Sequence, residues 1–113
     1  MKLTQAELYQ RLKTTGYPVA YHAFIVDAEH PAPEPPFIVY LRTFDTTIAS
    51  DFEVHGKWKN YQVELYTKEK DIAAERKVEA VLNHIDPEYD TSEIYIENEG
   101  LYQIVYLIKV VEI

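Results

Sequence analysis

The sequence predicts an α+β protein: a mainly antiparallel β-sheet of about five to six strands with two helices packed on one face. Three observations predict it. Apolar residues recur at helical spacing in two segments, residues 4–16 and 71–86. Other stretches are rich in β-branched and aromatic residues, and the order is helix, strands, helix, strands. The 113 residues predict one domain, residues 1–113, that buries about two-thirds of its unfolded surface.

The first segment carries the signals of a short helix. Thr4 is a candidate N-cap, and Glu7 three positions later completes a capping box in which each side chain satisfies a backbone amide of the other residue. Gly16, just before Tyr17-Pro18, is expected to end the helix. The apolar stripe between these signals consists of Leu8, Tyr9 and Leu12.

Two strands are predicted next, separated by a loop. Val19–Val26 is rich in β-branched and aromatic residues and predicts a strand. Asp27–Pro36 holds four prolines, which cannot sustain a strand ladder, so an extended, stiff loop is expected. Phe37–Thr43 is almost continuously apolar, as in a strand that is buried on both faces.

A hairpin is predicted after a polar connection at Asp45–Asp51. Phe52–Val54 would pair with Tyr61–Tyr66 across a glycine-containing turn at His55–Asn60. This arrangement puts Trp58 at the tip of the hairpin, between two lysines. Two interpretations stay open for Trp58: contact with a partner, or packing back onto its own hairpin.

The last third of the chain predicts a helix followed by a second hairpin. Asp71 is the expected N-cap, and Asp86-Pro87 ends the helix. Strands are expected at Ser92–Glu97 and Leu101–Val111, joined by a turn at residues 98–100. In the first of these strands Ile94 and Ile96 would point inward. The apolar stripe of the helix comprises Ala74, Val78, Val81, Leu82 and Ile85.

The composition narrows the functional classes. Eleven Lys and Arg against nineteen Asp and Glu give a formal charge of −8, which argues against a phosphate-binding surface. The chain has no cysteine, hence no disulfide, thiolate zinc site or cysteine nucleophile. The longest strongly apolar run, Ile104–Ile108, is far shorter than the ~20 residues that span a bilayer, and no targeting signal is evident. We expect a soluble protein used inside a cell.

The sequence offers no clear catalytic, cofactor or metal site. Three scattered glycines cannot form a phosphate cradle, and the four histidines lack the spacing of a metal site. His30, near Glu29 and Glu34, has two interpretations, a chelating group or a solvated loop. Neither Ser50 nor Ser92 has a histidine nearby in sequence, so no nucleophile triad is predicted.

The run from Asp86 to Glu99 contains six acids without any Lys or Arg. It is interpreted as a solvated strand face, as the carboxylates of a metal-dependent nuclease, or as a surface that repels a polyanion. Several tyrosines on predicted strands are candidates for interface anchors as well as for core positions. The candidate interface residues are Trp58, Phe52, Ile48, Tyr95, Glu93, Glu97 and Glu99.

Four segments together resemble a family of small phage and prophage proteins from long-tailed phages of Gram-positive bacteria. The family acts in tail completion, as tail terminators or tail-to-head joining proteins. The resemblance covers nearly the whole chain, in order, and it carries no catalytic residue over. The segments are Tyr9–Tyr21 (YQRLKTTGYPVAY), Pro35–Tyr40 (PPFIVY), Asn60–Thr67 (NYQVELYT) and Glu93–Tyr102 (EIYIENEGLY).

The resemblance implies a fold similar to the lambda tail terminator and a ring, expected to be a hexamer, at the end of the tail tube. The implied partners are further copies of the chain, the tail-tube protein and the head connector proteins, while DNA passes through without specific binding. No cofactor and no membrane are implied. The implied location is the host bacterial cytoplasm during assembly and then the tail-head junction of the virion. Two alternatives stay open: a small nuclease using the acids of residues 86–99, and a prophage regulatory module that binds through an exposed strand edge.

Overall fold

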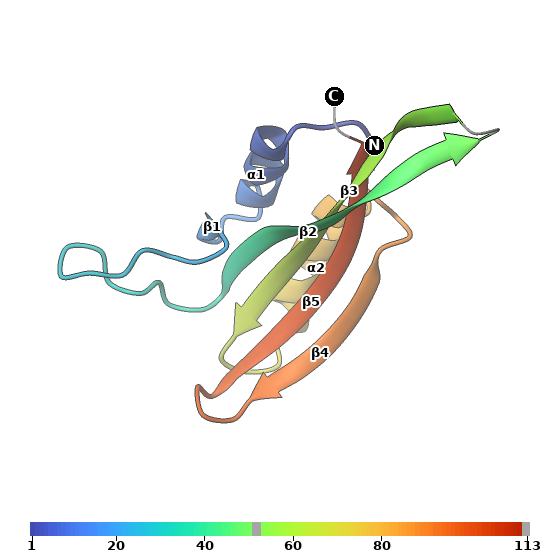
Figure 1. The fold of residues 1–113 in the computed structure, drawn as a ribbon. Coiled ribbons are helices and arrows are strands. Elements are labelled where there is room, and N and C mark those ends of the chain that lie inside the picture. Colours follow the sequence, from blue (N-terminus) through green and yellow to red (C-terminus); the bar gives the residue numbers. More distant parts are fainter. Residues whose placement is uncertain (51–52, 112–113) are drawn as a thin grey trace.

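A computed structural model describes residues 1–50 and 53–111. One five-stranded sheet has the strand order β1-β2-β3-β5-β4 (Figure 1). β1 runs parallel to β2, and the other neighbouring strands are antiparallel. The predicted α+β class is therefore confirmed. The elements are α1 (Gln5–Lys13), β1 (Val19–Tyr21), β2 (Phe37–Ser50), β3 (Glu53–Thr67), α2 (Ile72–Leu82), β4 (Asp90–Ile96) and β5 (Leu101–Val111).

Both predicted helices are present and begin at the predicted caps. The Thr4 hydroxyl accepts the Glu7 amide at 3.2 Å, and the Glu7 carboxylate accepts the Thr4 amide at 3.2 Å, which completes the capping box. The Asp71 carboxylate accepts the Ala74 amide at 3.0 Å. The apolar stripes of the two helices and one face of the sheet form a single hydrophobic cluster. Its fully buried side chains include Leu8, Leu12, Ile38, Val63, Leu65, Val78, Leu82 and Tyr106.

The predicted hairpin at residues 52–66 is wrong in its register. The segment expected to be a polar connection continues β2 as far as Ser50, and β3 runs without a break from Glu53 to Thr67. Gly56 therefore lies within a strand, opposite Ile48 and beside a shift in the pairing register. Tyr61 pairs with Arg42 of β2 rather than with a residue of 52–54, because the β2–β3 ladder continues as far as the pair of Ser50 and Glu53.

β1 is shorter than the predicted strand at Val19–Val26. Its three residues pair with Ile38, Val39 and Tyr40 of β2. The ladder ends at His22, whose φ of 69° turns the backbone away from the sheet, with its amide donating to the Tyr40 carbonyl at 2.8 Å. Ile25 is 84% exposed, so the apolar composition of this segment does not reflect a buried strand.

The side chains of β4 alternate between the two faces of the sheet as predicted, but they point to the opposite faces from those predicted. Ile94, expected to point inward, is 51% exposed and lies on the face opposite the helices. Glu93 lies on the helix side of the sheet, in register with Ile104. The helical layer covers the centre of the sheet, whereas β4 is an edge strand, so every residue from Asp90 to Tyr95 is exposed on either face.

The outer part of the β2–β3 hairpin, here called the arm, comprises residues 47–50 of β2 and 53–57 of β3, which pair beyond the end of β5. The arm projects beyond the helix-covered body (Figure 1). The molecule is correspondingly elongated, with extents of 51 × 30 × 25 Å. At the base of the arm the N-terminal segment runs along β5, where the Leu3 amide donates to the Val111 carbonyl at 3.1 Å.

Candidate interaction surface

The sheet face opposite the helices, here called the open face, presents three cross-strand rows of side chains. Register and alternation place these residues together. The face is only partly polar, and Val39 and Glu64 at its centre are only 7% and 8% exposed. The rows are Leu41, Gln62, Leu107 and Asp90; then Val39, Glu64, Val105 and Ser92; then Phe37, Tyr66, Gln103 and Ile94.

A hydrogen-bonded network occupies the centre of the open face. The Glu64 carboxylate accepts a hydrogen bond from the Gln62 side-chain amide and another from the Tyr66 hydroxyl, the latter at 2.9 Å. Gln103 in turn donates to the Tyr66 hydroxyl oxygen at 2.8 Å. Burial and the hydrogen bond to Glu64 raise the pKa of Tyr66 to about 12. The donors that satisfy this buried carboxylate are thus neutral groups.

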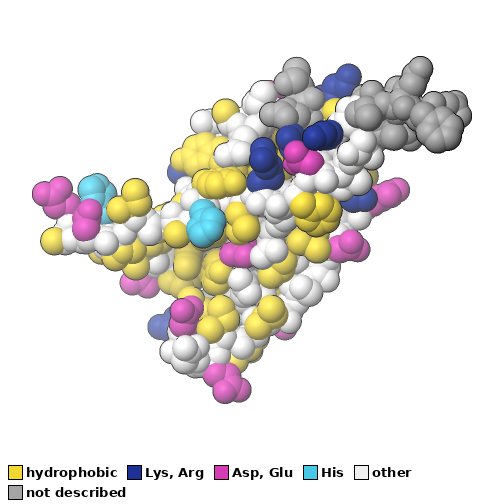
Figure 2. Space-filling view, viewed as in Figure 1, with side chains coloured by type: hydrophobic (Ala, Val, Ile, Leu, Met, Phe, Trp, Pro, Cys, Tyr) yellow, Lys and Arg dark blue, Asp and Glu magenta, His cyan; other side chains and the backbone are white. Residues whose placement is uncertain are grey.

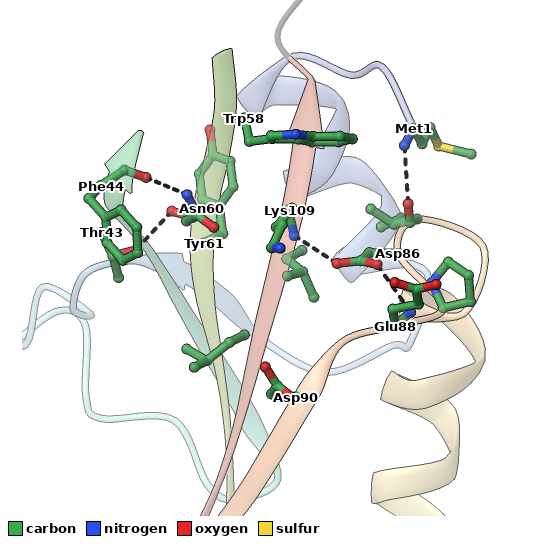
Figure 3. A pocket seen from close by; sticks show the side chains of 14 residues that line it. Met1, Thr43, Phe44, Trp58, Asn60, Tyr61, Asp86, Glu88, Asp90 and Lys109 are labelled. Carbon is green, nitrogen blue, oxygen red and sulfur yellow. Dashed lines mark hydrogen bonds between the residues drawn. The ribbon is translucent and has the colours of Figure 1, made fainter. Parts of the chain in front are cut away.

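A groove of about 420 Å³ lies at the base of the arm, between β3, β5 and the segment after α2 (Figure 3). Asp86 fixes its floor: one carboxylate oxygen accepts the Lys109 amide at 3.0 Å, and the other accepts the Glu88 amide at 3.1 Å. The groove therefore combines aromatic and charged side chains in one concavity. Its lining includes Met1, Phe44, Trp58, Asn60, Glu88, Asp90, Leu107 and Lys109.

The irregular part of β2 holds one wall of the groove. Lys59 donates to Asp45 at 2.7 Å, and this bond lowers the pKa of the Asp45 carboxyl below its usual value. The Asn60 side chain donates to the Phe44 carbonyl at 2.9 Å, and the Thr43 hydroxyl donates to the Asn60 carbonyl at 3.1 Å. These bonds hold Phe44, which is 65% exposed, at the rim.

Four of the predicted interface residues are not acids, and the structure describes three of them. Trp58 is not at a hairpin tip: it lies within β3, opposite Thr46 and Val111, and its half-buried side chain lines the groove. Tyr95 is 50% exposed, and its ring lies 4.8 Å from that of Tyr102, centre to centre. Phe52 lies outside the described residues. Of Ile48 the structure describes only the backbone, which pairs with Gly56.

The acids of residues 86–99 are distributed over three places rather than one. Asp86, Glu88 and Asp90 line the groove. Glu93 pairs with Lys70, which also pairs with Glu75 at 2.8 Å. Glu97 and Glu99 are exposed at the β4–β5 turn.

Among these acids, Glu93 interacts with a nearby base, Lys70. Glu75 and then Glu93 raise the pKa of Lys70 above its ordinary value. The sequence run lacks a base, but the fold brings Lys70 to it from the β3–α2 connection. Within residues 1–50 and 53–111, no group of three or more His, Cys, Asp or Glu is arranged to hold a metal ion. His30 lies 3.0 Å from Asp27.

Several groove residues were not among the predictions. Phe44 and Asn60 come together through hydrogen bonds across the β2–β3 ladder, and Lys109 joins them from β5. The register that aligns them depends on where the hairpin turns, and the sequence misplaced that turn. A large apolar residue, Phe44, within a polar stretch was the one signal available.

On the open face, Lys and Arg gather where the arm leaves the body, while Asp and Glu lie mainly toward β4 and at the tips (Figure 2).

A scan against models of protein families and a search of curated proteins found no match. Among solved structures, the chain is similar to one in a structure described as the virion of a native gene transfer agent particle. The TM-score is 0.57 with 13% identity, over 92% of this chain and 90% of that chain. The two chains share a fold. No helix in the described part of this chain is long and apolar enough to cross a membrane.

Proposed function

We propose that this chain is a structural virion protein that caps a phage tail tube and joins tail to head as the subunit of a ring. The observation that carries the proposal is the shared fold with a chain of a virion particle, which extends over nearly the full length of both chains. The resemblance of four sequence segments to tail-completion proteins supports the finer role. The proposed partners are further copies of the chain, a tail-tube protein and head connector proteins.

The shape of the molecule is compatible with a ring subunit. The arm projects from one end of the sheet, and β4 leaves an exposed strand edge on the side of the sheet away from β1 (Figure 1). Head-to-tail contacts between two different surfaces of one chain close into a ring when the rotation between neighbours is right. Because the open face exposes scattered rather than continuous apolar side chains, we expect a ring that forms on assembly rather than a permanent oligomer.

Electron microscopy of the purified protein mixed with tail tubes tests this role. We expect additional ring-shaped density at one end of the tube and, for the protein alone, a mass that rises with concentration in sedimentation experiments. Tubes whose ends stay unchanged, together with a dimer whose mass is constant down to nanomolar protein, would contradict the proposal.

We further propose that the acids at the β4–β5 turn face the channel through which DNA passes. A cationic lining would retain DNA through counterion release, whereas carboxylates repel phosphate. Glu97 and Glu99 are the residues to test, since Glu93 is engaged by Lys70. Both are exposed, so replacement by lysine should leave folding nearly unchanged.

The variant Glu97→Lys/Glu99→Lys should assemble on tails but deliver DNA poorly, with a smaller defect at high salt. Glu29→Lys/Glu34→Lys in the proline-rich loop is the matched control, with the same change of charge at two exposed sites. Normal infectious particles from the turn variant would show that these acids do not line the channel.

A further inference from the structure

The groove at the base of the arm has the chemistry of a site for a cationic side chain. Trp58 and Phe44 contribute aromatic surface, and Glu88 and Asp90 contribute carboxylates to the same concavity (Figure 3). We propose that this groove binds a basic segment of a partner protein, with an arginine side chain as the anchor. The inference adds a binding site and rests on no part of the ring proposal.

The carboxylates of the groove differ in how far they are already engaged. Both oxygens of Asp86 accept backbone amides, so this residue shapes the groove. Among the described residues, the carboxylates of Glu88 and Asp90 make no hydrogen bond or ion pair, and both residues are exposed. Lys109 and the Met1 amino group, which donates to the Ile85 carbonyl at 3.4 Å, offset part of the negative charge. Glu88 and Asp90 are therefore the acids that an incoming cation would neutralise.

The aromatic side chains favour arginine as that cation. A guanidinium group is planar, stacks on aromatic faces and donates to carboxylates through two parallel N–H groups. Tryptophan has the aromatic face with the strongest attraction for cations. The Asn60 side chain donates to the backbone carbonyl of Phe44, and the exposed Phe44 ring offers apolar contact to the residues beside the arginine. At about 420 Å³ the groove has room for one long side chain and part of its backbone.

The charge of the groove selects a protein partner. Lys and Arg side chains gather where the arm leaves the body (Figure 2), so the negative charge of the groove is confined to the side formed by Glu88, after α2, and Asp90, at the start of β4. These two carboxylates repel the phosphates of nucleic acids and lipids but attract a basic peptide segment. The whole chain carries a formal charge of −8, so cationic segments are attracted to it over longer distances as well.

The single tryptophan of the chain makes the groove directly observable. The fluorescence of Trp58 is titrated with acetyl-Gly-Arg-Gly-amide and with the citrulline counterpart, which has the same shape without the charge. We expect the arginine peptide to bind about tenfold more tightly, and the difference to shrink at high salt. Equal responses to the two peptides would overturn the proposal.

Two double variants locate the effect. Glu88→Gln/Asp90→Asn should abolish the preference for arginine, while Glu97→Gln/Glu99→Gln, the same loss of charge outside the groove, should retain it. Lys109→Gln removes a competing cation and should tighten binding by about threefold. Retention of the preference by the first variant would overturn the proposal. So would a self-association of the wild type that this variant alone abolishes, because a second copy would then occupy the groove.

Discussion

The two faces of the sheet differ although the same strands build them. On the helix side, the row of Ile38, Leu65 and Ile104 is apolar and at most 3% exposed. On the open face, the adjacent row contains Val39 and Glu64, the latter a carboxylate buried to 8% exposure. The helix side is buried by packing against the helices, whereas neighbouring side chains on the open face are joined by hydrogen bonds.

The difference indicates that the helix side mainly provides stability, whereas the open face mainly fixes the positions of its side chains. Helix packing removes apolar surface from water and supplies most of the stability. A buried carboxylate with neutral donors contributes less stability, because its hydrogen bonds largely replace those it made with water. It fixes the positions of Gln62 and Tyr66 instead, and so keeps the open face in one defined arrangement.

The largest effect is expected from the helix side. Leu65→Ala should lower the free energy of unfolding by about 2–5 kcal/mol, because Leu65 is fully buried under the helices. Ile94→Ala on the open face removes a side chain that is 51% exposed and should cost about 1 kcal/mol or less. Urea denaturation of both variants measures the contrast, and equal losses would show that the open face is as closely packed as the other.

A smaller effect is expected from the network on the open face. Glu64→Ala leaves the Tyr66 hydroxyl and the Gln62 amide without their acceptor and should cost about 1–3 kcal/mol. Glu97→Ala at the exposed turn is the control, with an expected change close to zero. Denaturation at neutral pH gives both values. A gain in stability for Glu64→Ala would mean that burying this carboxylate costs more than its hydrogen bonds return.

The network should also make stability depend on alkaline pH. The pKa of Tyr66 is about 12 in the folded state, against about 10 in an unfolded chain. The folded state therefore holds this proton more tightly. Its contribution to stability is complete below pH ~10 and is lost as the pH rises toward ~12.

Tyr66→Phe tests this dependence. Stability measured between pH ~9 and ~11.5 should fall less steeply in this variant than in the wild type. Burial and the hydrogen bond to Glu79 also raise the pKa of Tyr106, so some slope should remain. Tyr95→Phe, at an exposed position, should keep the wild-type slope; a slope unchanged in Tyr66→Phe would contradict the assignment.

The smallest effect is expected at the exposed margin of the sheet. Lys70→Gln removes the cation that pairs with Glu75 and Glu93. Because this cation lies in solvent, the loss of stability should be slight at low salt and should vanish at high salt. Thermal unfolding at two salt concentrations measures it. A loss that persists at high salt would show that Lys70 holds β4 by more than charge.

Signals confined to one segment predicted much of the fold. The capping box of Thr4 and Glu7 and the cap at Asp71 located the helix starts. The turn at residues 98–100 located the second hairpin, where the Gly100 amide donates to the Ile96 carbonyl at 2.8 Å. The first hairpin was misplaced because Gly56 signals a turn in sequence but lies at an irregularity of the ladder in the fold.

The candidate groove was predictable only in part. Trp58 stood out as a large apolar residue between lysines, and it does line the groove, but as a residue of a strand rather than of a tip. Phe44 and Lys109 could not be associated with it, since their proximity depends on the pairing of three strands. Long-range register is decided by which alignment buries the most apolar surface, and a single segment does not contain that information.

By itself, the sequence determined the helices, their caps and the alternation of side chains along each strand, because these follow from contacts within a few residues. The tertiary structure decided which of the two alternating sets of side chains lies on the helix side of the sheet and which on the open face. Ile94 and Glu93 alternate as expected, yet the isoleucine faces the open side and the glutamate faces Lys70, since the helices do not reach the edge strand. It also decided that Asp86 shapes a groove while Glu97 stays in solvent, because burial and partners depend on what the rest of the chain brings to each position.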